Sequence, residues 1–212
     1  MTPSRIAFAV ALGLAPTAAF AQTPAISEAL PTGVSFVLTT GAELAAGLGA
    51  FLAIAGLGLR QAGLVGAGGR ATALYMTFGV AALAALATWL AGSRLMYAID
   101  PGALLGRAFP WSPLPDAEGD VDQHAAFFRG AAFAALAAAI AAGAVAERVR
   151  LWPYFLFAAG FAALVYPIAG SWIWGGGYLA ATWGFVDQGG AAVVHIVGGA
   201  AALAGALVVG VR

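Results

Sequence analysis

The chain has 212 residues, of which 62% are hydrophobic and only 8% are charged, and its formal net charge is +0. A soluble domain is about half apolar and about a quarter charged, so this chain has too little polar surface for a soluble globule and is predicted to be an integral membrane protein. The zero net charge and the lack of a basic block argue against nucleic acid as a partner. The absence of Cys excludes disulfides, thiol catalysis and Cys-based metal sites.

The first residues are typical of a secretory signal peptide. Arg5 supplies a positive start, residues 6–14 form a short apolar core, and residues 19–21 give a small-x-small cleavage site. The alternative is an uncleaved first anchor, but the core is too short to span a bilayer. We therefore expect a signal peptide at 1–21 and a transmembrane domain at 22–212. Cleavage would leave the mature N-terminus outside the inner membrane of a bacterium.

Five apolar runs approach the length of about 20 residues that a helix needs to cross the hydrocarbon core of a bilayer. Backbone N–H and C=O groups in lipid must be paired within the segment, so these runs are predicted to be helices. The alternation of a transmembrane barrel is absent. The sequence thus predicts an all-α polytopic membrane protein with helices at 34–59, 71–96, 125–146, 151–172 and 190–209.

The charges between these runs predict the orientation. Positively charged connections stay in the cytoplasm, so the first–second and third–fourth connections are predicted to lie inside. The acidic connection between the second and third runs is then outside, together with the N-terminus, and the C-terminus is cytoplasmic. The charges are Arg60, Arg70, Arg148 and Arg150 inside, and Asp100, Asp116, Glu118, Asp120 and Asp122 outside.

The fifth run holds His195, and Asp187 comes just before that run. An ionisable side chain inside a membrane is costly and by default marks a functional site. At mid-membrane, a neutral imidazole is either satisfied by a neighbouring helix or lines a path for a small polar molecule or a proton. Asp187 is a natural N-cap, because its carboxylate can accept hydrogen bonds from the free N–H groups of the helix start. Asp187 is therefore either only a helix cap or also part of the functional site.

Two aromatic residues and one acid complete the candidates. Trp174, at the outer end of the fourth run, is either a membrane-belt tryptophan or a ring face that attracts a small cation. Phe133 lies in the outer half of the third run, where a lone phenylalanine usually packs. Glu43 lies within the first run and is expected to pair with Arg94 or Arg129 near the outer side.

No nucleophile, base and acid occur at catalytic spacing, and the GxSxG, HExxH and P-loop patterns are absent. An enzyme is therefore not predicted, and no cofactor or metal is expected. Two functional hypotheses remain, a conduction path for a small molecule and a non-conducting membrane assembly or sensor subunit.

A series of motifs in the second half of the chain resembles the ammonium transporter family, which includes the rhesus proteins. The motifs are GAVAER at 143–148, YP at 166–167, WIWGGG at 172–177, DQGG at 187–190, VVH at 193–195 and GVR at 210–212. The resemblance implies a channel fold of two inverted five-helix halves, of which this chain supplies the N-terminal half. It also implies a homotrimer, and a further segment or partner chain that supplies the second half.

The resemblance implies a role for individual residues. Trp174 matches the aromatic residue that recruits ammonium at the outer mouth, and Phe133 matches a phenylalanine of the gate. His195 matches the first of two pore-lining histidines, and Asp187 matches the acid that supports the outer site. The expected function is passage of ammonium or ammonia through a hydrophobic, histidine-lined pore that is incomplete in this chain. The alternative is a non-conducting assembly or an ammonium-sensing subunit.

The chain departs from the family pattern near these residues. The family usually has an aromatic residue where this chain has Gln188, and a threonine where it has Ala192. The second outer phenylalanine would fall at Arg129, with Phe128 one position away, so Phe128 is also placed on the expected substrate path. A cation at position 129 would repel ammonium unless Glu43 or an outer acid neutralised it.

Overall fold

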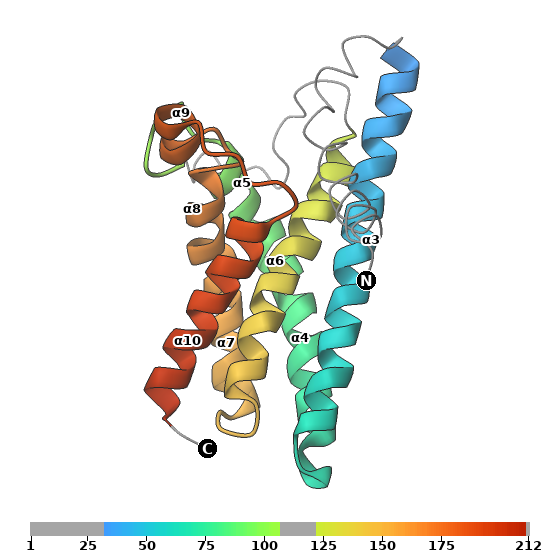
Figure 1. Cartoon of the computed structure of the whole chain (residues 1–212), viewed down its shortest axis with the longest axis vertical. Helices are drawn as coiled ribbons and strands as arrows, with labels where there is room; N and C mark the ends of the chain where they lie inside the picture. Colours follow the sequence, from blue (N-terminus) through green and yellow to red (C-terminus); the bar gives the residue numbers. More distant parts are fainter. Residues whose placement is uncertain (1–31, 107–121, 211–212) are drawn as a thin grey trace, which may run out of the picture.

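The computed structural model describes residues 32–106 and 122–210, and these residues form helices and connecting turns without a strand (Figure 1). The predicted signal peptide and most of the acidic connection lie outside the described residues. The helical elements are α3 (Thr32–Leu64), η1 (Ala67–Gly69), α4 (Arg70–Ala87), η2 (Thr88–Gly92), α5 (Ser93–Tyr97), α6 (Gln123–Val145), α7 (Leu151–Gly160), η3 (Phe161–Val165), α8 (Tyr166–Ser171), α9 (Tyr178–Trp183), η4 (Ala191–Ile196) and α10 (Val197–Val209).

Five helical stretches in the described part of the chain are long and apolar enough to cross a membrane. They are Gly33–Leu64, Ala67–Tyr97, Gln123–Val145, Leu151–Ser171 and Ala191–Val209. These stretches match the predicted runs in number and order, and their ends differ from the predicted ends by a few residues. The prediction of an all-α polytopic membrane protein is confirmed.

The first helix runs past its predicted end because Gln61 is held inside the fold. The Gln61 side chain is buried, its Nε2 donates to the Ala139 carbonyl oxygen (3.2 Å), and its Oε1 accepts from Thr77 Oγ1 (2.7 Å). A buried amide whose polar atoms are bonded carries little penalty. α3 therefore continues to Leu64 and carries Arg60 within its last turns rather than in a connecting loop.

α6 lies at the centre of the fold and contacts α3, α4 and α10 (Figure 1). It is the most buried of the candidate spans in the described ranges, and its buried residues are mostly alanine. Small residues let helices approach closely in lipid, where no hydrophobic effect drives helices together. A Cβ placed on Gly198 of α10 would lie 2.8 Å from the Ala137 carbonyl oxygen of α6. The close contact of α6 with α10 fixes the helix that follows His195.

Two π-helical segments, η2 and η3, pack against each other. A Cβ on Gly92 of η2 would lie 2.7 Å from the Ala162 carbonyl oxygen and 3.0 Å from Cγ of Pro167, so the close approach requires glycine. Pro167 also has no N–H to donate to the carbonyl group four residues earlier, in η3. The missing hydrogen bond gives a physical reason for the wider turn that precedes Pro167.

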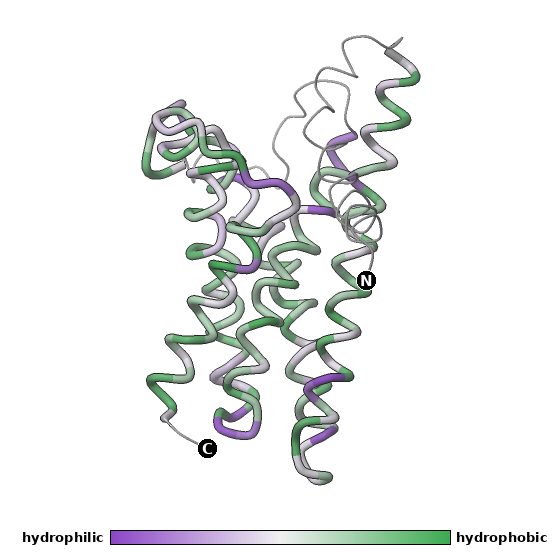
Figure 2. Tube along the Cα trace, viewed as in Figure 1, coloured by the Kyte–Doolittle hydropathy of each residue, from purple (hydrophilic) through white to green (hydrophobic). Residues whose placement is uncertain are grey.

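Polar residues gather toward the ends of the bundle, and apolar residues dominate its middle (Figure 2). At one end, the Arg148 guanidinium donates to the Gly210 carbonyl oxygen, and the Gly66 N–H donates to Oε1 of Glu147 (2.9 Å). These contacts join the α3–α4 turn, the α6–α7 turn and the end of α10. The opposite end carries α9 and the start of α3 (Figure 1). The arginines next to or within these two turns, Arg60, Arg70, Arg148 and Arg150, therefore share one end of the bundle.

Candidate functional site

Trp174 is positioned by a tight glycine turn that follows α8. A Cβ on Gly177 would lie 2.6 Å from the Ser171 carbonyl oxygen, and a Cβ on Gly175 would overlap the Met96 carbonyl oxygen. Any larger residue would push the turn away from α5 and α8. The glycines that the sequence places after Trp174 thus set the path of the chain beside this ring.

Trp174 and Phe133 form an aromatic pair. Their ring centroids are 5.9 Å apart and their planes are tilted by 45°. This distance lies within the range of favourable ring contacts, and both side chains are half-buried. Two of the predicted site residues, one from α6 and one from the turn after α8, are therefore brought together.

Asp187 links this aromatic pair to the last span. The Trp174 Nε1–H donates to the Asp187 backbone oxygen (3.1 Å). The Asp187 carboxylate accepts from the backbone N–H groups of Ala192 (Oδ1, 3.1 Å) and Val193 (Oδ2, 2.8 Å). These N–H groups are two of the donors at the start of η4 that have no partner within the helix. The positive end of the helix dipole also stabilises a negative charge at this position. The Asp187 carboxylate thus bonds free N–H groups at the start of the fifth span, as predicted, although the N-cap residue itself is Gly190.

His195 lies in η4, with its side chain exposed and not enclosed by another helix of the described ranges. Its Nδ1 lies 3.1 Å from the Gly190 carbonyl oxygen, which also accepts from the His195 backbone N–H (3.1 Å). A carbonyl oxygen only accepts, so this contact is a hydrogen bond when Nδ1 carries the proton, and Nε2 is then an acceptor. Val193 and Val194 are buried, whereas Ile196 is 67% exposed. The imidazole thus presents an acceptor on an open and otherwise apolar face.

Arg129 lies beside the aromatic pair and is held there by an acid. Its Cζ is 5.7 Å from the Phe133 ring centroid and 5.6 Å from the Trp174 ring centroid. Its Nε donates to Oε2 of Glu43, and each of the two side chains is 22% exposed. Of the two partners predicted for Glu43, the structure pairs it with Arg129. Cation–π contacts of both rings with Arg129 are a feature that the sequence reasoning missed.

Phe128 lies away from the aromatic pair. Its ring centroid is 5.6 Å from that of Phe51, and its edge fills the space beside Gly47, both on α3. Residue 129, not residue 128, is therefore the α6 position that faces Trp174. The structure does not bring Phe128 together with the other predicted site residues.

The hydroxyl groups of two tyrosines, Tyr97 and Tyr166, lie near Arg129. Their hydroxyl oxygens are buried, and neither has a hydrogen-bond partner within residues 32–106 and 122–210. Buried hydroxyls of this kind are normally bonded, so these two groups are an exception beside Arg129. The only sequence signal for these two groups is the presence of tyrosine near the ends of two apolar runs.

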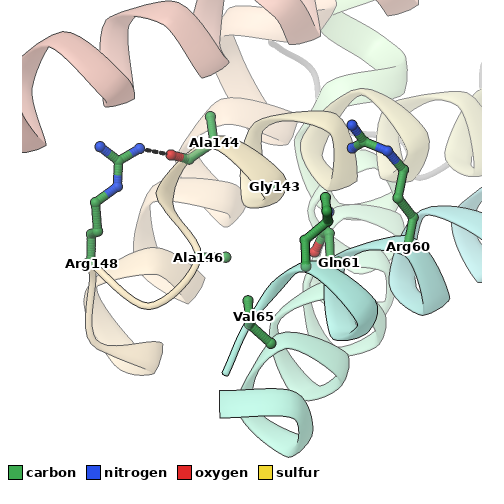
Figure 3. Close-up of a pocket in the computed structure, with 8 residues that line it drawn as sticks. Arg60, Gln61, Val65, Gly143, Ala144, Ala146 and Arg148 are labelled. Carbon is green, nitrogen blue, oxygen red and sulfur yellow. Dashed lines mark hydrogen bonds between the residues drawn. The ribbon is translucent and has the colours of Figure 1, made fainter. Parts of the chain in front are cut away.

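A cavity of about 160 Å³ lies at the opposite end of the bundle, between α3 and the end of α6 (Figure 3). Arg148 turns back so that its guanidinium donates to the Ala144 carbonyl oxygen, as the dashed line in Figure 3 shows. A Cβ on Gly143 would lie 3.0 Å from Gln61 Nε2, so glycine makes room for the buried amide. The sequence reasoning missed this polar site, although a lone Gln next to an apolar run was a signal for it. The lining residues are Arg60, Gln61, Leu64, Val65, Gly143, Ala144, Ala146 and Arg148.

The fold and the site define a polytopic helical membrane protein with an aromatic pair at one end and a histidine on an exposed face of its last span. Residues 42–212 match the model of the Ammonium Transporter Family, and the chain belongs to this family. No group of three or more metal-ligating side chains that could hold an ion occurs in the part of the chain that the structure describes.

Individual relatives cover most of the chain. The Synechocystis sp. protein sll1017 is 39% identical over 164 residues, which are 74% of this chain and 36% of that protein. Ammonium transporter Amt2 of Archaeoglobus fulgidus is 33% identical over 167 residues, which are 74% of this chain and 35% of that protein. The chain therefore spans about a third of the length of these curated relatives.

Solved structures show the same fold. The chain is similar to a structure described as Sensor Amt Protein, with a TM-score of 0.75 and 27% identity, over 85% of this chain and 46% of that chain. It is also similar to the crystal structure of Candida albicans Mep2, with a TM-score of 0.72 and 27% identity, over 86% of this chain and 42% of that chain.

Proposed function

We propose that this chain forms one wall of a path that carries ammonium or ammonia across a membrane. The observation that carries the proposal is that the aromatic pair and His195 belong to one bonded unit. Trp174 donates to the backbone oxygen of Asp187, and the carboxylate of Asp187 caps the segment that bears His195. Asp187 therefore links the Trp174 ring to the helical segment that carries the His195 imidazole.

The chemistry of this unit suits a small amine. The ring faces of the aromatic pair can accept weak hydrogen bonds from the N–H groups of an amine. Nε2 of His195 offers an acceptor to an N–H group on a face that is otherwise apolar. Bringing an ion into an apolar layer costs far more than bringing in a neutral molecule, so we propose that the uncharged amine passes His195. The names of the matched relatives support the same class of substrate.

The assembly and orientation are also proposals. Since the chain spans less than half of the matched structures, we propose that a further segment or a partner chain supplies the second wall, as a fold of two inverted repeats requires. The family resemblance supports a homotrimer. The shared end of the arginine-bearing turns supports a cytoplasmic position for that end, with the N-terminus outside the inner membrane.

A second candidate function is a non-conducting membrane assembly or an ammonium-sensing subunit. Arg129 favours the absence of conduction, because its guanidinium lies against the ring faces that a free cation would use on its way into a path. The name of one matched structure, Sensor Amt Protein, is in keeping with it. An enzymatic activity is not proposed, because the names of the matched family and relatives describe transporters.

Uptake of radiolabelled methylammonium by cells that express the full-length protein tests the proposal. We expect His195→Ala to abolish uptake, because the acceptor on the exposed face is lost. Leu156→Ala, at a position of α7 that is 77% exposed, is the matched control and should keep uptake. Uptake by His195→Ala equal to that of the unaltered protein contradicts the assigned role. Binding of methylammonium without uptake favours the second candidate.

A further inference from the structure

The guanidinium of Arg129 occupies the space next to the aromatic pair. Its Cζ lies 5.7 Å from the Phe133 ring centroid and 5.6 Å from the Trp174 ring centroid. A cation within about 6 Å of a ring centroid is attracted to the face of that ring. The guanidinium is also bonded to the carboxylate of Glu43. One cation of the chain itself is therefore bound by two rings and one acid.

These three groups are the ones that would bind a small organic cation from solution. Because Arg129 is already bound to all three, a second cation in the same space would meet a like charge at short range. The side chains of Arg129 and Glu43 are only 22% exposed, so little water is present to screen the repulsion. The aromatic pair is thus not open to a free cation while Arg129 stays in place.

The fold keeps Arg129 in this position. The preceding residue, Phe128, packs against Phe51 and Gly47 on α3, which fixes the rotation of α6 about its axis. Moving the guanidinium away would leave the Glu43 carboxylate partly buried without its partner, which is strongly unfavourable. A guanidinium also keeps its charge over the physiological pH range. The ion pair is therefore a permanent part of the site.

We propose that Arg129 is a resident cation that makes the aromatic pair selective for uncharged molecules. Free ammonium-type ions are excluded from the two ring faces, and a neutral amine is the class of molecule that can approach them. This inference rests on the proposed function only in taking the aromatic pair as part of the path. The occupied state of the ring faces does not depend on whether the protein conducts.

Equilibrium binding of radiolabelled methylammonium to the purified full-length protein at neutral pH, where this probe is charged, tests the inference. The double variant Glu43→Gln/Arg129→Met removes both charges together and so frees the ring faces without changing the net charge. We expect the double variant to bind methylammonium roughly tenfold more tightly than the unaltered protein. Arg129→Lys, which keeps a cation, should bind as weakly as the unaltered protein.

Two controls locate the effect. Adding Trp174→Leu to the double variant should reduce the gain, because one of the two ring faces is removed. Arg70→Met, at the other end of the bundle, should not change binding. If the double variant does not fold, Arg129→Gln takes its place, since glutamine can still donate a hydrogen bond to Glu43 and should also bind more tightly than Arg129→Lys.

Equal affinities of the unaltered protein and the double variant, or Arg129→Gln where it takes its place, would overturn the inference, and so would no binding in any variant. This failure is distinguishable from failure of the proposed function, because the assay measures binding and not uptake. A protein that never transports still yields a ratio of affinities. Conversely, uptake that depends on His195 supports the path even when substitution of Arg129 leaves binding unchanged.

Discussion

Replacing Asp187 with alanine should loosen the start of the last span while leaving the rest of the bundle intact. The carboxylate accepts hydrogen bonds from the backbone N–H groups of Ala192 and Val193, at 3.1 Å and 2.8 Å. Without it, these donors at the beginning of η4 lose their partners. The hydrogen bond from Trp174 goes to the backbone oxygen of Asp187, so alanine keeps that contact.

The size of the effect follows from the two hydrogen bonds. Loss of an N-cap side chain costs about 0.5–2 kcal/mol, and a hydrogen bond to a charged group contributes about 1.5–3 kcal/mol. Asp187 makes two bonds but is only half-buried, so water replaces part of the loss, and we expect a cost of about 2 kcal/mol for alanine. Since 1.4 kcal/mol is a factor of ten, local opening of η4 should increase about 30-fold. Asparagine keeps one acceptor oxygen and should cost about half as much.

Hydrogen–deuterium exchange followed by mass spectrometry measures this opening directly. Peptides that cover residues 191–196 should exchange faster in Asp187→Ala, and those of α6 should not. Asp122→Ala is a matched control, because the Asp122 carboxylate also accepts from two N–H groups at a helix start, those of His124 (2.9 Å) and Ala125 (3.0 Å) in α6. This control should loosen the start of α6 only. Unchanged exchange at 191–196 in Asp187→Ala would refute the reasoning.

Two further outcomes are expected. Gln61→Met should lower the free energy of unfolding in detergent by about 1 kcal/mol, because the hydrogen bonds with Thr77 and Ala139 are lost. Side-chain hydrogen bonds inside membrane proteins contribute about 0.6–1.7 kcal/mol. An unchanged free energy of unfolding would contradict this expectation. The chain contains no Cys, so single cysteines report its orientation. Gly68→Cys should react with a membrane-impermeant thiol reagent only from the cytoplasmic side, and Thr182→Cys only from outside, whereas the reverse pattern would show that the orientation is wrong.

The membrane spans could be predicted because a bilayer leaves few choices for an apolar run of this length. The ends of the spans were less predictable. Arg60 and Gln61 read as the start of a loop, yet the amide of Gln61 is bonded by Thr77 and Ala139, so the helix continues. Those partners lie on other helices, and no local pattern in the sequence reveals them.

The cap at Asp187 was predictable for a local reason, since an acid just before an apolar run meets free N–H groups. The pairing of Glu43 was predictable only as a choice between two arginines, because the choice depends on how α3 faces α6. The π-helical segment that carries His195 was not predictable. It depends on tertiary packing that individual residue propensities do not encode.

The choice between Phe128 and Arg129 shows a further limit. Adjacent residues of a helix point about 100° apart, so only one of the two can face Trp174. α6 is apolar on nearly all sides and rich in alanine, so no hydrophobic stripe marks the side that faces the core. In the structure, Phe128 packs on Phe51 and Arg129 contacts the aromatic pair, so residue 129 is the one that faces Trp174.

The most direct test of the central claim is methylammonium uptake into liposomes that contain the purified full-length protein, compared between the unaltered protein, His195→Ala and Leu156→Ala. If His195 lines the path, the unaltered protein and Leu156→Ala should take up methylammonium, and His195→Ala should lose uptake. Equal uptake by all three proteins would contradict the claim that this histidine lies on the path.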